Sequence, residues 1–396
     1  RGDALGREEL LSLPRRRYLL RRRQRPRHHK GESSPVGHKR VIEEMRMRIA
    51  IDCRYLGKSG IGRVCQGILD NLDYSEHEYV LIGNEKRLSA YPSARLISDD
   101  GNPFSAKGLF SFPKEINRDC DCIIIPNFII PYGIKIPVYT VMHDLIFLDL
   151  PKITTKGFAD YRIKKMLLKR CMKKSVRIAC VSGFTKSRCE HYFPKYAGKC
   201  YVNYIGLSKE VLNFDATGIE KTNSIVYVGN VKPHKGLKTL IDAFHLLPKG
   251  MYQLKIIGER EGFLVGMNEE DLQSDDVIFT GRLDDEQLLR EIASAKFLVQ
   301  PSLYEGFGLP PLEALYLGTQ PVISDIPVFK EVYGDLPVIF FKTGNAEDLR
   351  KEILSEKNNK IDFDGKKMRV LNYENFISII SVMIEKGGTY AANCRN

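Results

Sequence analysis

Short apolar runs recur along the chain from Met47 onward, and most of them end at a glycine or a polar residue. Such runs, bounded by turn residues, are typical of strands buried on both faces of a sheet. Stretches with helical spacing of apolar residues lie between several of them, and this alternation predicts an α/β fold with mostly parallel sheets. The predicted strands, some with the turn that follows, are residues 48–52, 78–82, 122–125, 138–141 and 177–181, then 224–230, 255–258, 277–283, 297–302 and 321–324.

The length of the chain predicts more than one hydrophobic core. A chain of 396 residues exceeds the size at which single cores stop growing. Apolar periodicity is lost from residue 207 to residue 223, so we place an interdomain linker there. The predicted units are a disordered basic leader at 1–46, an α/β domain at 47–210, a second α/β domain at 213–370, and a last helix with a tail at 371–396.

Two glutamates, Glu305 and Glu313, frame a glycine- and proline-rich turn between two predicted strands. Gly306 and Gly308 permit a tight turn and a close approach of a ligand to backbone N–H groups. The proline pair that follows suits a helix start, where free N–H groups attract anions. Ligands of open α/β sheets bind at the carboxyl ends of strands, where this corner is expected. We therefore predict that the two carboxylates hold different parts of one ligand, with an anion on the amides from Phe307 onward.

The run from Tyr304 to Glu313 resembles the E-x7-E signature of retaining glycosyltransferases of family 4, and the resemblance covers most of the chain from Met47. It implies the GT-B fold, with two Rossmann-like domains facing across a cleft and a last helix that crosses back onto the first domain. It also implies transfer of a sugar from a nucleotide donor with retention of configuration. Glu305 would hold hydroxyls of the transferred sugar and Glu313 the ribose, and the donor would contact the turn at Gly306, Phe307, Gly308 and Leu309.

A second turn carries Lys235 close to a predicted helix start. A lysine there can stabilise a departing diphosphate, although a solvated turn lysine is the alternative. The stretch from Gly229 to Gly236 resembles the family run G-[RN]-x-x-x-x-K-G, in which the lysine binds the donor phosphates. Asn230 stands where many members have arginine, so Lys232 or Arg63 would supply the missing charge.

Four further positions are expected to reach the donor. Gly60 and Gly62 lie in a glycine-rich turn between the first strand and a helix, which the resemblance places near the diphosphate and the acceptor. His143 ends a predicted strand, and the resemblance implies that it faces the transferred sugar, with a purely structural histidine as the alternative. Arg282 is expected at the nucleotide base, with a cap or a salt bridge as the alternative role.

Residues 161–174 form a predicted basic amphipathic helix, with Ile163, Met166 and Leu167 at helical spacing among lysines and arginines. The plain interpretation is a surface helix packed on the sheet. Such a helix can also lie on an anionic membrane, as the resemblance implies for members that use lipid-linked acceptors. We expect a cytoplasmic protein with peripheral contact to the inner face of the membrane through this helix.

The net charge of +12 is concentrated in the leader. Residues 1–46 hold 14 basic and 6 acidic residues, a net charge of +8, which leaves +4 for the rest of the chain. Such a leader can bind nucleic acid or anionic lipid. We favour a disordered tail and expect no specific nucleic-acid partner.

Nine cysteines are scattered along the chain, and only Cys120 and Cys122 are close in sequence. No second pair completes a zinc site, and Cys180 lies in an apolar run as a buried thiol does. We therefore expect free thiols in a reducing compartment, with a zinc site as the less favoured alternative. No Asp-x-Asp run lies at the carboxyl end of a predicted strand, so neither a metal nor another cofactor is expected.

These predictions describe a retaining glycosyltransferase that moves a sugar from a nucleotide-sugar donor to a glycan or lipid-linked acceptor in cell-surface polysaccharide biosynthesis. GDP-mannose is the first choice of donor, because the stretch from Gly229 to Leu237 resembles mannosyltransferases of O-antigen assembly; a UDP-sugar is the second. Two alternatives stay open. One is a sugar-nucleotide epimerase or a phosphorylase with the same two-domain shell, and the other is a nucleic-acid binder acting through residues 1–46.

Overall fold

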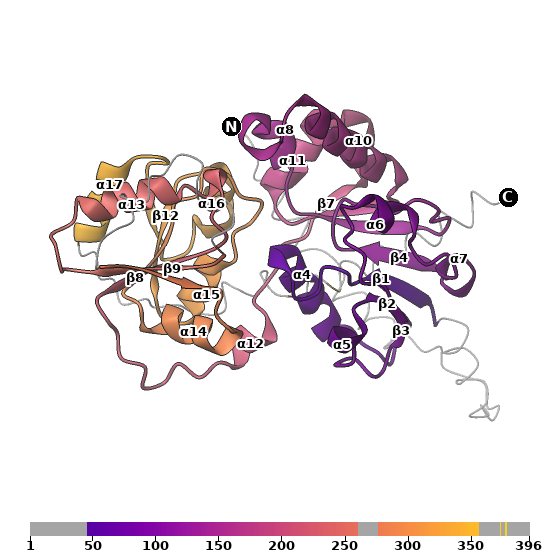
Figure 1. Ribbon diagram of the computed structural model, residues 1–396, viewed down its shortest axis with the longest axis horizontal. Helices are drawn as coiled ribbons and strands as arrows, with labels where there is room; N and C mark the ends of the chain where they lie inside the picture. Colours follow the sequence, from indigo (N-terminus) through magenta and orange to yellow (C-terminus); the bar gives the residue numbers. More distant parts are fainter. Residues whose placement is uncertain (1–45, 260–275, 356–372, 374–376, 378–396) are drawn as a thin grey trace, which may run out of the picture. The chain divides into compact units, whose positions relative to one another are not determined.

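The computed structural model describes residues 46–259 and 276–355, together with Tyr373 and Ile377 (Figure 1). All of these except Arg46 belong to one compact unit, Met47–Asn396. The predicted leader lies outside the described residues, as does nearly all of the predicted last helix. Tyr373 is helical and packs on Gly67, where a Cβ would lie 2.2 Å from the tyrosine ring. The predicted domain limits stay predictions.

The first sheet has seven parallel strands in the order β3-β2-β1-β4-β5-β6-β7. The order runs outward from the β1–β4 pair in both directions. At such a reversal the connections leave on opposite faces of the sheet, and a crevice opens at the carboxyl ends. The strands are β1 (Arg48–Asp52), β2 (Glu78–Gly83), β3 (Arg95–Ser98), β4 (Cys122–Ile125), β5 (Val138–Met142), β6 (Arg177–Cys180) and β7 (Cys200–Val202).

Helices cover both faces of this sheet (Figure 1). Ile49 and Ile51 of β1 face Ile68 in one apolar cluster, whereas Ala50 of the same strand belongs to a second cluster with Leu168. This alternation is the period of two expected for a strand buried on both sides. The first cluster lies under α4 (Ser59–Asp70) and α5 (Glu85–Leu88); the second lies under α7 (Ile116–Asp119), α8 (Ile146–Asp149), α10 (Phe158–Lys174) and α11 (Gly183–Tyr192). Shorter elements are α6 (Ala106–Phe110), α9 (Pro151–Thr154) and a 3-10 helix (Pro194–Lys199).

The second sheet has six parallel strands in the order β10-β9-β8-β11-β12-β13, with the same reversal at β8–β11. α13 and α17 cover one face, and α14 and α15 cover the other (Figure 1). The strands are β8 (Ser224–Val228), β9 (Gln253–Ile257), β10 (Val277–Gly281), β11 (Phe297–Gln300), β12 (Gln320–Ser324) and β13 (Ile339–Phe341). The helices are α12 (Lys209–Asn213), which precedes this sheet, a 3-10 turn (Pro233–Lys235), α13 (Leu237–His245), α14 (Asp285–Ser294), α15 (Pro310–Tyr316), α16 (Pro327–Tyr333) and α17 (Ala346–Leu354).

Every strand predicted from an apolar run is present, within a few residues of its expected limits. Three short strands at or near the sheet edges, β3, β7 and β13, were not predicted. The segment predicted as a linker also contains a helix, α12, and two buried apolar residues, Leu207 and Val211. None of the described helices is both long and apolar enough to cross a bilayer.

The basic helix α10 exists, but its buried face differs from the prediction. Leu167, Leu168, Cys171 and Met172 are buried. Ile163 and Met166, which were expected to pack, are 53% and 55% exposed. The helix therefore presents apolar side chains to solvent among its lysines and arginines.

Candidate active site

The two glutamates lie on one strand–loop–helix corner of the second sheet. β11 ends at Gln300, the loop that follows carries Glu305, and α15 begins at Pro310 and carries Glu313 in its first turn. Gly318, with a left-handed φ of 72°, follows the end of α15, as glycines commonly do at helix ends. The corner is thus at the carboxyl end of a strand, where parallel sheets bind ligands.

Glu305 is paired with Lys235. The Lys235 Nζ donates to the Glu305 Oε1 over 2.7 Å, and the Ser302 Oγ donates to the same oxygen over 2.8 Å. The lysine and glutamate side chains are 23% and 10% exposed, so water screens the pair only partly. Gly236, with a left-handed φ of 67°, allows this approach, because a Cβ there would lie 2.0 Å from a backbone carbonyl oxygen of the glutamate loop.

Glu313 is paired with Arg63 of α4. The Arg63 Nη1 donates to the Glu313 Oε1 over 2.6 Å, and the Nη2 lies 3.6 Å from the Oδ1 of Asp285. The Glu313 side chain is 4% exposed and the Arg63 side chain 37%. The second oxygen of Glu313, Oε2, is buried and has no hydrogen-bond partner among the described residues. This acid therefore retains an unused acceptor.

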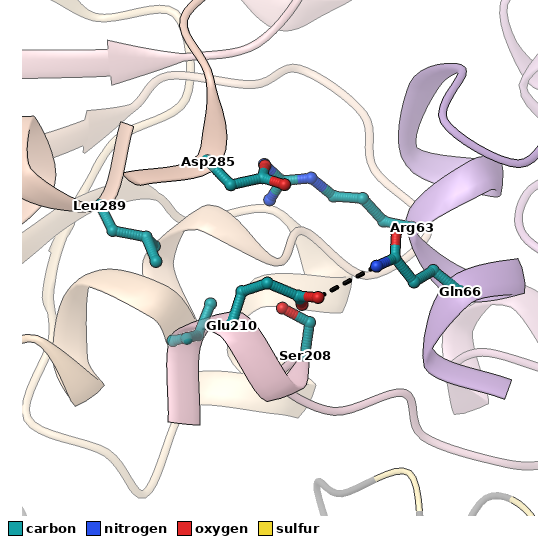
Figure 2. Close-up of a pocket in the computed structure, with 7 residues that line it drawn as sticks. Arg63, Gln66, Ser208, Glu210, Asp285 and Leu289 are labelled. Carbon is teal, nitrogen blue, oxygen red and sulfur yellow. Dashed lines mark hydrogen bonds and ion pairs between the residues drawn. The ribbon is translucent and has the colours of Figure 1, made fainter. Parts of the chain in front are cut away.

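A small pocket lies beside Arg63, between α4, α12 and α14 (Figure 2). Within it Arg63 extends toward Asp285, and the Gln66 Nε2 donates to the Glu210 Oε1 over 3.0 Å. The lining residues are Arg63, Gln66, Ser208, Glu210, Val211, Asp285 and Leu289. Neither paired glutamate lines it, so the ion pairs rather than this pocket define the candidate site.

The glycine loop is bonded to residues of the first sheet. The Ser182 Oγ, at the start of α11, donates to the Gly306 carbonyl oxygen over 2.7 Å. A Cβ at Gly306 would lie 1.8 Å from the carbonyl oxygen of His143, so only glycine fits there. Gly308 has a left-handed φ of 86°, and its carbonyl accepts a hydrogen bond from the Tyr333 hydroxyl. The loop is therefore held at both glycines.

His143 follows β5 and lies against this loop. Its Nε2 donates to the Pro126 carbonyl oxygen over 2.8 Å. Burial lowers the pKa of His143, against the raising effects of that carbonyl and of Asp144, so the ring is neutral at pH 7. Burial raises the pKa of Asp144, although the Ile146 N–H that its Oδ1 accepts opposes this. Asp144 thus orders the turn, and the Nδ1 of the neutral histidine is left as an acceptor.

Gly60 and Gly62 lie elsewhere than predicted. They are inside the first turn of α4, which begins at Ser59, and not in a turn ahead of the helix. A Cβ at Gly62 would lie 2.3 Å from the Tyr55 carbonyl oxygen, whereas a Cβ at Gly60 would meet nothing within 4 Å. Gly62 is therefore required by packing, and Gly60 leaves open space at the helix start.

Three predicted donor contacts are polar side chains at the ends of strands. Asn230 and Lys232, after β8, are exposed. The Arg282 Nη2 donates to the Gly57 carbonyl oxygen over 3.2 Å, and its Nη1 lies 3.6 Å from the Oε1 of Glu259. The salt bridge that was the alternative role of Arg282 is present, and its contact with a base stays a prediction.

Two predicted contacts can act only through their backbone. The Phe307 side chain is buried in the apolar cluster beneath the loop. Leu309 is half-buried, and its carbonyl accepts from the N–H groups of Leu312 and Glu313. Both side chains therefore support the loop and leave at most their amides to a ligand.

Sequence reasoning did not assign Arg63 to Glu313, or Ser302 and Ser182 to the glutamate loop. Arg63 directly follows Gly62 near the start of a helix, at the edge of the sheet where a ligand was expected. A cation at that position could have indicated a site residue. The two serines gave none, because their partners are fixed only by the tertiary fold.

Part of the chain is similar to known proteins. Residues 210–373 match the family model described as glycosyl transferases group 1. The chain is 27% identical over 229 residues to O-antigen chain mannosyltransferase B of Escherichia coli, which covers 54% of this chain and 59% of the relative. It is 30% identical over 216 residues to O-antigen chain mannosyltransferase RfbU of Salmonella typhimurium, covering 52% and 60%. The chain thus spans about three fifths of the length of these relatives.

A solved structure shares the architecture. Sucrose-phosphate synthase from Thermosynechococcus elongatus superposes with a TM-score of 0.66 at 16% identity, over 88% of this chain and all of the other. The two parallel sheets with their covering helices are accordingly a GT-B fold, as the sequence predicted. The residues that match the glycosyl transferases group 1 model, 210–373, include Lys235 and both glutamates of the ion pairs.

Proposed function

We propose that the protein is a retaining glycosyltransferase that moves a hexose from a nucleotide sugar to a glycan or lipid-linked acceptor. The observation that carries the proposal is the pair of glutamates on one corner, each with a single carboxylate oxygen held by a cation. Lys235 holds Glu305 and Arg63 holds Glu313. Two acids, of which Glu313 keeps one carboxylate oxygen without a partner among the described residues, and two cations are the chemistry that a sugar diphosphate needs.

In this proposal Glu313 binds the ribose hydroxyls through its carboxylate. Its Oε2 has no partner among the residues that the structure describes, yet it is buried. A donor can reach the carboxylate only if Arg63, which is 37% exposed, moves away from it. The freed guanidinium then lies near the donor phosphates. It supplies there the positive charge that the neutral Asn230 does not.

Glu305 receives hydroxyls of the transferred sugar, and Lys235 turns from the glutamate to the diphosphate. A cation beside the leaving group stabilises the charge that develops on it. The bond between the anomeric carbon and the phosphate oxygen breaks, and a bond from the acceptor oxygen to the same face of that carbon forms. The acceptor proton passes to the leaving phosphate. His143 contacts the sugar from the other side. The cations supply the charge that this step requires, so we propose a reaction without a metal or another cofactor.

The donor that we propose first is GDP-mannose. Both relatives described above are mannosyltransferases of O-antigen chains, and the Gly229–Leu237 stretch resembles such enzymes. A UDP-sugar is the second choice. A nucleotide that binds only the native state raises the melting temperature. A thermal-shift comparison of GDP, UDP, ADP and CMP on the full chain therefore identifies the nucleotide.

We further propose that α10 contacts an anionic membrane. Phe158, Ile163 and Met166 are exposed on this helix, at 73%, 53% and 55%, beside Arg162 and Lys165. Apolar side chains flanked by cations are the features with which a helix lies in the headgroup region. This arrangement would place the enzyme beside a lipid-linked acceptor.

Turnover of the donor by matched variants tests the function. Lys235→Ala should lower the release of nucleoside diphosphate from GDP-mannose by roughly 10²–10³-fold, the usual loss when one group that stabilises developing charge is removed. Glu313→Gln should also lower it. Lys238→Ala is the control, because Lys238 lies on α13 and pairs with Asp242 in an exposed i,i+4 contact. Wild-type turnover by folded Lys235→Ala and Glu313→Gln would refute the proposal.

A further inference from the structure

Three cysteines that are distant in sequence meet outside the active site. Cys180 ends β6, Cys189 lies in α11, and Cys200 begins β7. All three are buried, with at most 4% exposure. Their sulfur atoms lie within 4.8 Å of one another, and the Cys180 and Cys189 sulfurs are 4.0 Å apart.

This spacing is that of ligands around one ion. A metal–sulfur bond of about 2.3 Å places sulfurs about 3.8 Å apart in tetrahedral and about 4.0 Å apart in trigonal coordination. At the upper limit of 4.8 Å, an ion at the centre would lie about 2.8 Å from each sulfur, so a shift of about 0.5 Å per side chain closes the site. Rotamer adjustments of this size need no movement of the backbone.

We propose that Cys180, Cys189 and Cys200 bind one thiophilic closed-shell metal ion, Zn(II) or Cu(I), as three thiolates. No imidazole or carboxylate joins the cluster within the part of the chain that the structure describes. Sulfur ligands alone select these soft or borderline ions over magnesium, calcium or manganese. The three thiols lose three protons as three metal–sulfur bonds form, and no electron is transferred.

Three thiolates with Zn(II) carry a net charge of −1, and with Cu(I) a net charge of −2. The Tyr196 carbonyl oxygen lies 3.9 Å from the Cys200 sulfur. The expectation of free thiols and no metal, drawn from the sequence, did not consider these three together.

The ion would fix the helix that positions the glycine loop. α11 bonds the Gly306 carbonyl through the Ser182 hydroxyl, and its first amides, those of Gly183 and Phe184, donate to the Glu331 carboxylate over 2.6 and 2.7 Å. A metal that ties α11 to β6 and β7 is therefore a structural element beneath the candidate active site. It takes no part in the transfer reaction.

The test is reconstitution of the full chain, reduced and handled without air, with zinc chloride or with a soluble Cu(I) complex. Metal is counted by mass spectrometry after gel filtration, and released protons are titrated. We expect about one ion and about three protons per chain, and a higher melting temperature with metal. Competition between the two ions shows which of them the site binds more tightly.

Cys189→Ser should bind less than about a tenth of an ion and lose the metal-dependent rise in melting temperature. Cys122→Ser is the matched control, because Cys122 is equally buried but lies on β4, in the other apolar cluster. If Cys189→Ser does not fold, Cys200→Ala replaces it. Wild-type protein that retains neither ion, or a Cys189 variant that binds like wild type, overturns the proposal. A Cys180–Cys189 disulfide in protein isolated without air overturns it too.

Discussion

The contact between Arg63 and Glu313 can be tested by a double-mutant cycle with Arg63→Met and Glu313→Gln. The pair joins α4, beside the first sheet, to α15, beside the second, across 250 positions of sequence. Arg63→Met leaves a carboxylate that is 4% exposed without its cation. Glu313→Gln leaves a guanidinium that water reaches and that still faces Asp285. The two single variants should therefore differ in cost.

The magnitude follows from the exposure of the two partners. Removing one member of a fully buried pair costs about 3–5 kcal/mol. The Arg63 side chain is 37% exposed, so solvent screens the pair. Because of this screening, we expect the free energy of unfolding to fall by about 2 kcal/mol in Arg63→Met and by about 1 kcal/mol in Glu313→Gln. The double variant leaves neither a carboxylate nor a guanidinium without its partner and should lose about 1–2 kcal/mol of unfolding free energy. The coupling energy between the two positions is then about 1–2 kcal/mol.

Urea unfolding of the four proteins measures this coupling. With slopes of about 1–3 kcal/mol/M, a loss of 2 kcal/mol lowers the midpoint by about 0.7–2 M. Asp285→Asn is the control, because Asp285 is 68% exposed and 3.6 Å from Arg63, and its cost should stay within about 0.5 kcal/mol. The coupling should shrink in saturating nucleoside diphosphate, since the proposed donor displaces Arg63. Additivity within about 0.3–0.5 kcal/mol would refute the argument.

Three further predictions concern backbone packing, pH and the membrane. Gly306→Ala should unfold or inactivate the protein, because its Cβ would lie 1.8 Å from a backbone oxygen. Gly60→Ala should fold normally and lose donor turnover. Equal melting temperatures for the two variants would contradict this prediction. Burial, and then Lys235, lower the pKa of His234 to about 4. The unfolded chain thus binds more protons between that value and about 6.5, and stability should fall as pH drops through this window. His234→Gln should flatten this slope of urea midpoint against pH. Met166→Glu on α10 should weaken flotation with phosphatidylglycerol vesicles but leave turnover of soluble donor unchanged, and unaltered flotation would exclude this face as the contact.

The strands that sequence could predict are those that are buried on both faces. β1, β4 and β5 lie inside the first sheet, and nearly every residue in them is buried, so apolar residues dominate each of them. β3 (Arg95–Ser98) and β13 (Ile339–Phe341) lie at the sheet edges and are largely half-buried or exposed. β3 has only two apolar positions and β13 is only three residues long, and strands this short are hard to distinguish from loops. Their place is set by pairing with a neighbour, which no local pattern contains.

The basic helix shows how periodicity alone can mislead. Ile163, Met166 and Leu167 follow helical spacing, and so do Leu167, Leu168 and Cys171. Both sets define an apolar stripe, and only the second faces the sheet. The sequence therefore established that a helix forms here but not which side of it is buried.

The corner that carries the glutamates was predictable because its chemistry is local. Glycines, a proline pair and two acids within ten residues restrict the backbone to few conformations. The cations that face those acids were only partly predictable. Lys235 was predicted from its own motif, but its partner Glu305 lies 70 positions away in sequence. Glu313 lies 250 positions away from its partner Arg63. The first pair exists only once the second sheet has folded, and the second pair only once both sheets have folded.

The glycine loop connects these observations, because it is fixed by parts of the chain that local sequence could not relate. The Gly306 carbonyl is bonded by Ser182 of α11, and its α-carbon lies under the His143 carbonyl. The Thr185 Oγ1, also of α11, donates to that same His143 oxygen over 3.0 Å. One helix thus orders both the loop that carries Glu305 and the strand end that carries His143. Any group that stabilises α11, including a metal ion bound at Cys189, should therefore affect catalysis by holding the loop and the strand end in place. Loss of the ion should lower turnover without altering which nucleotide binds.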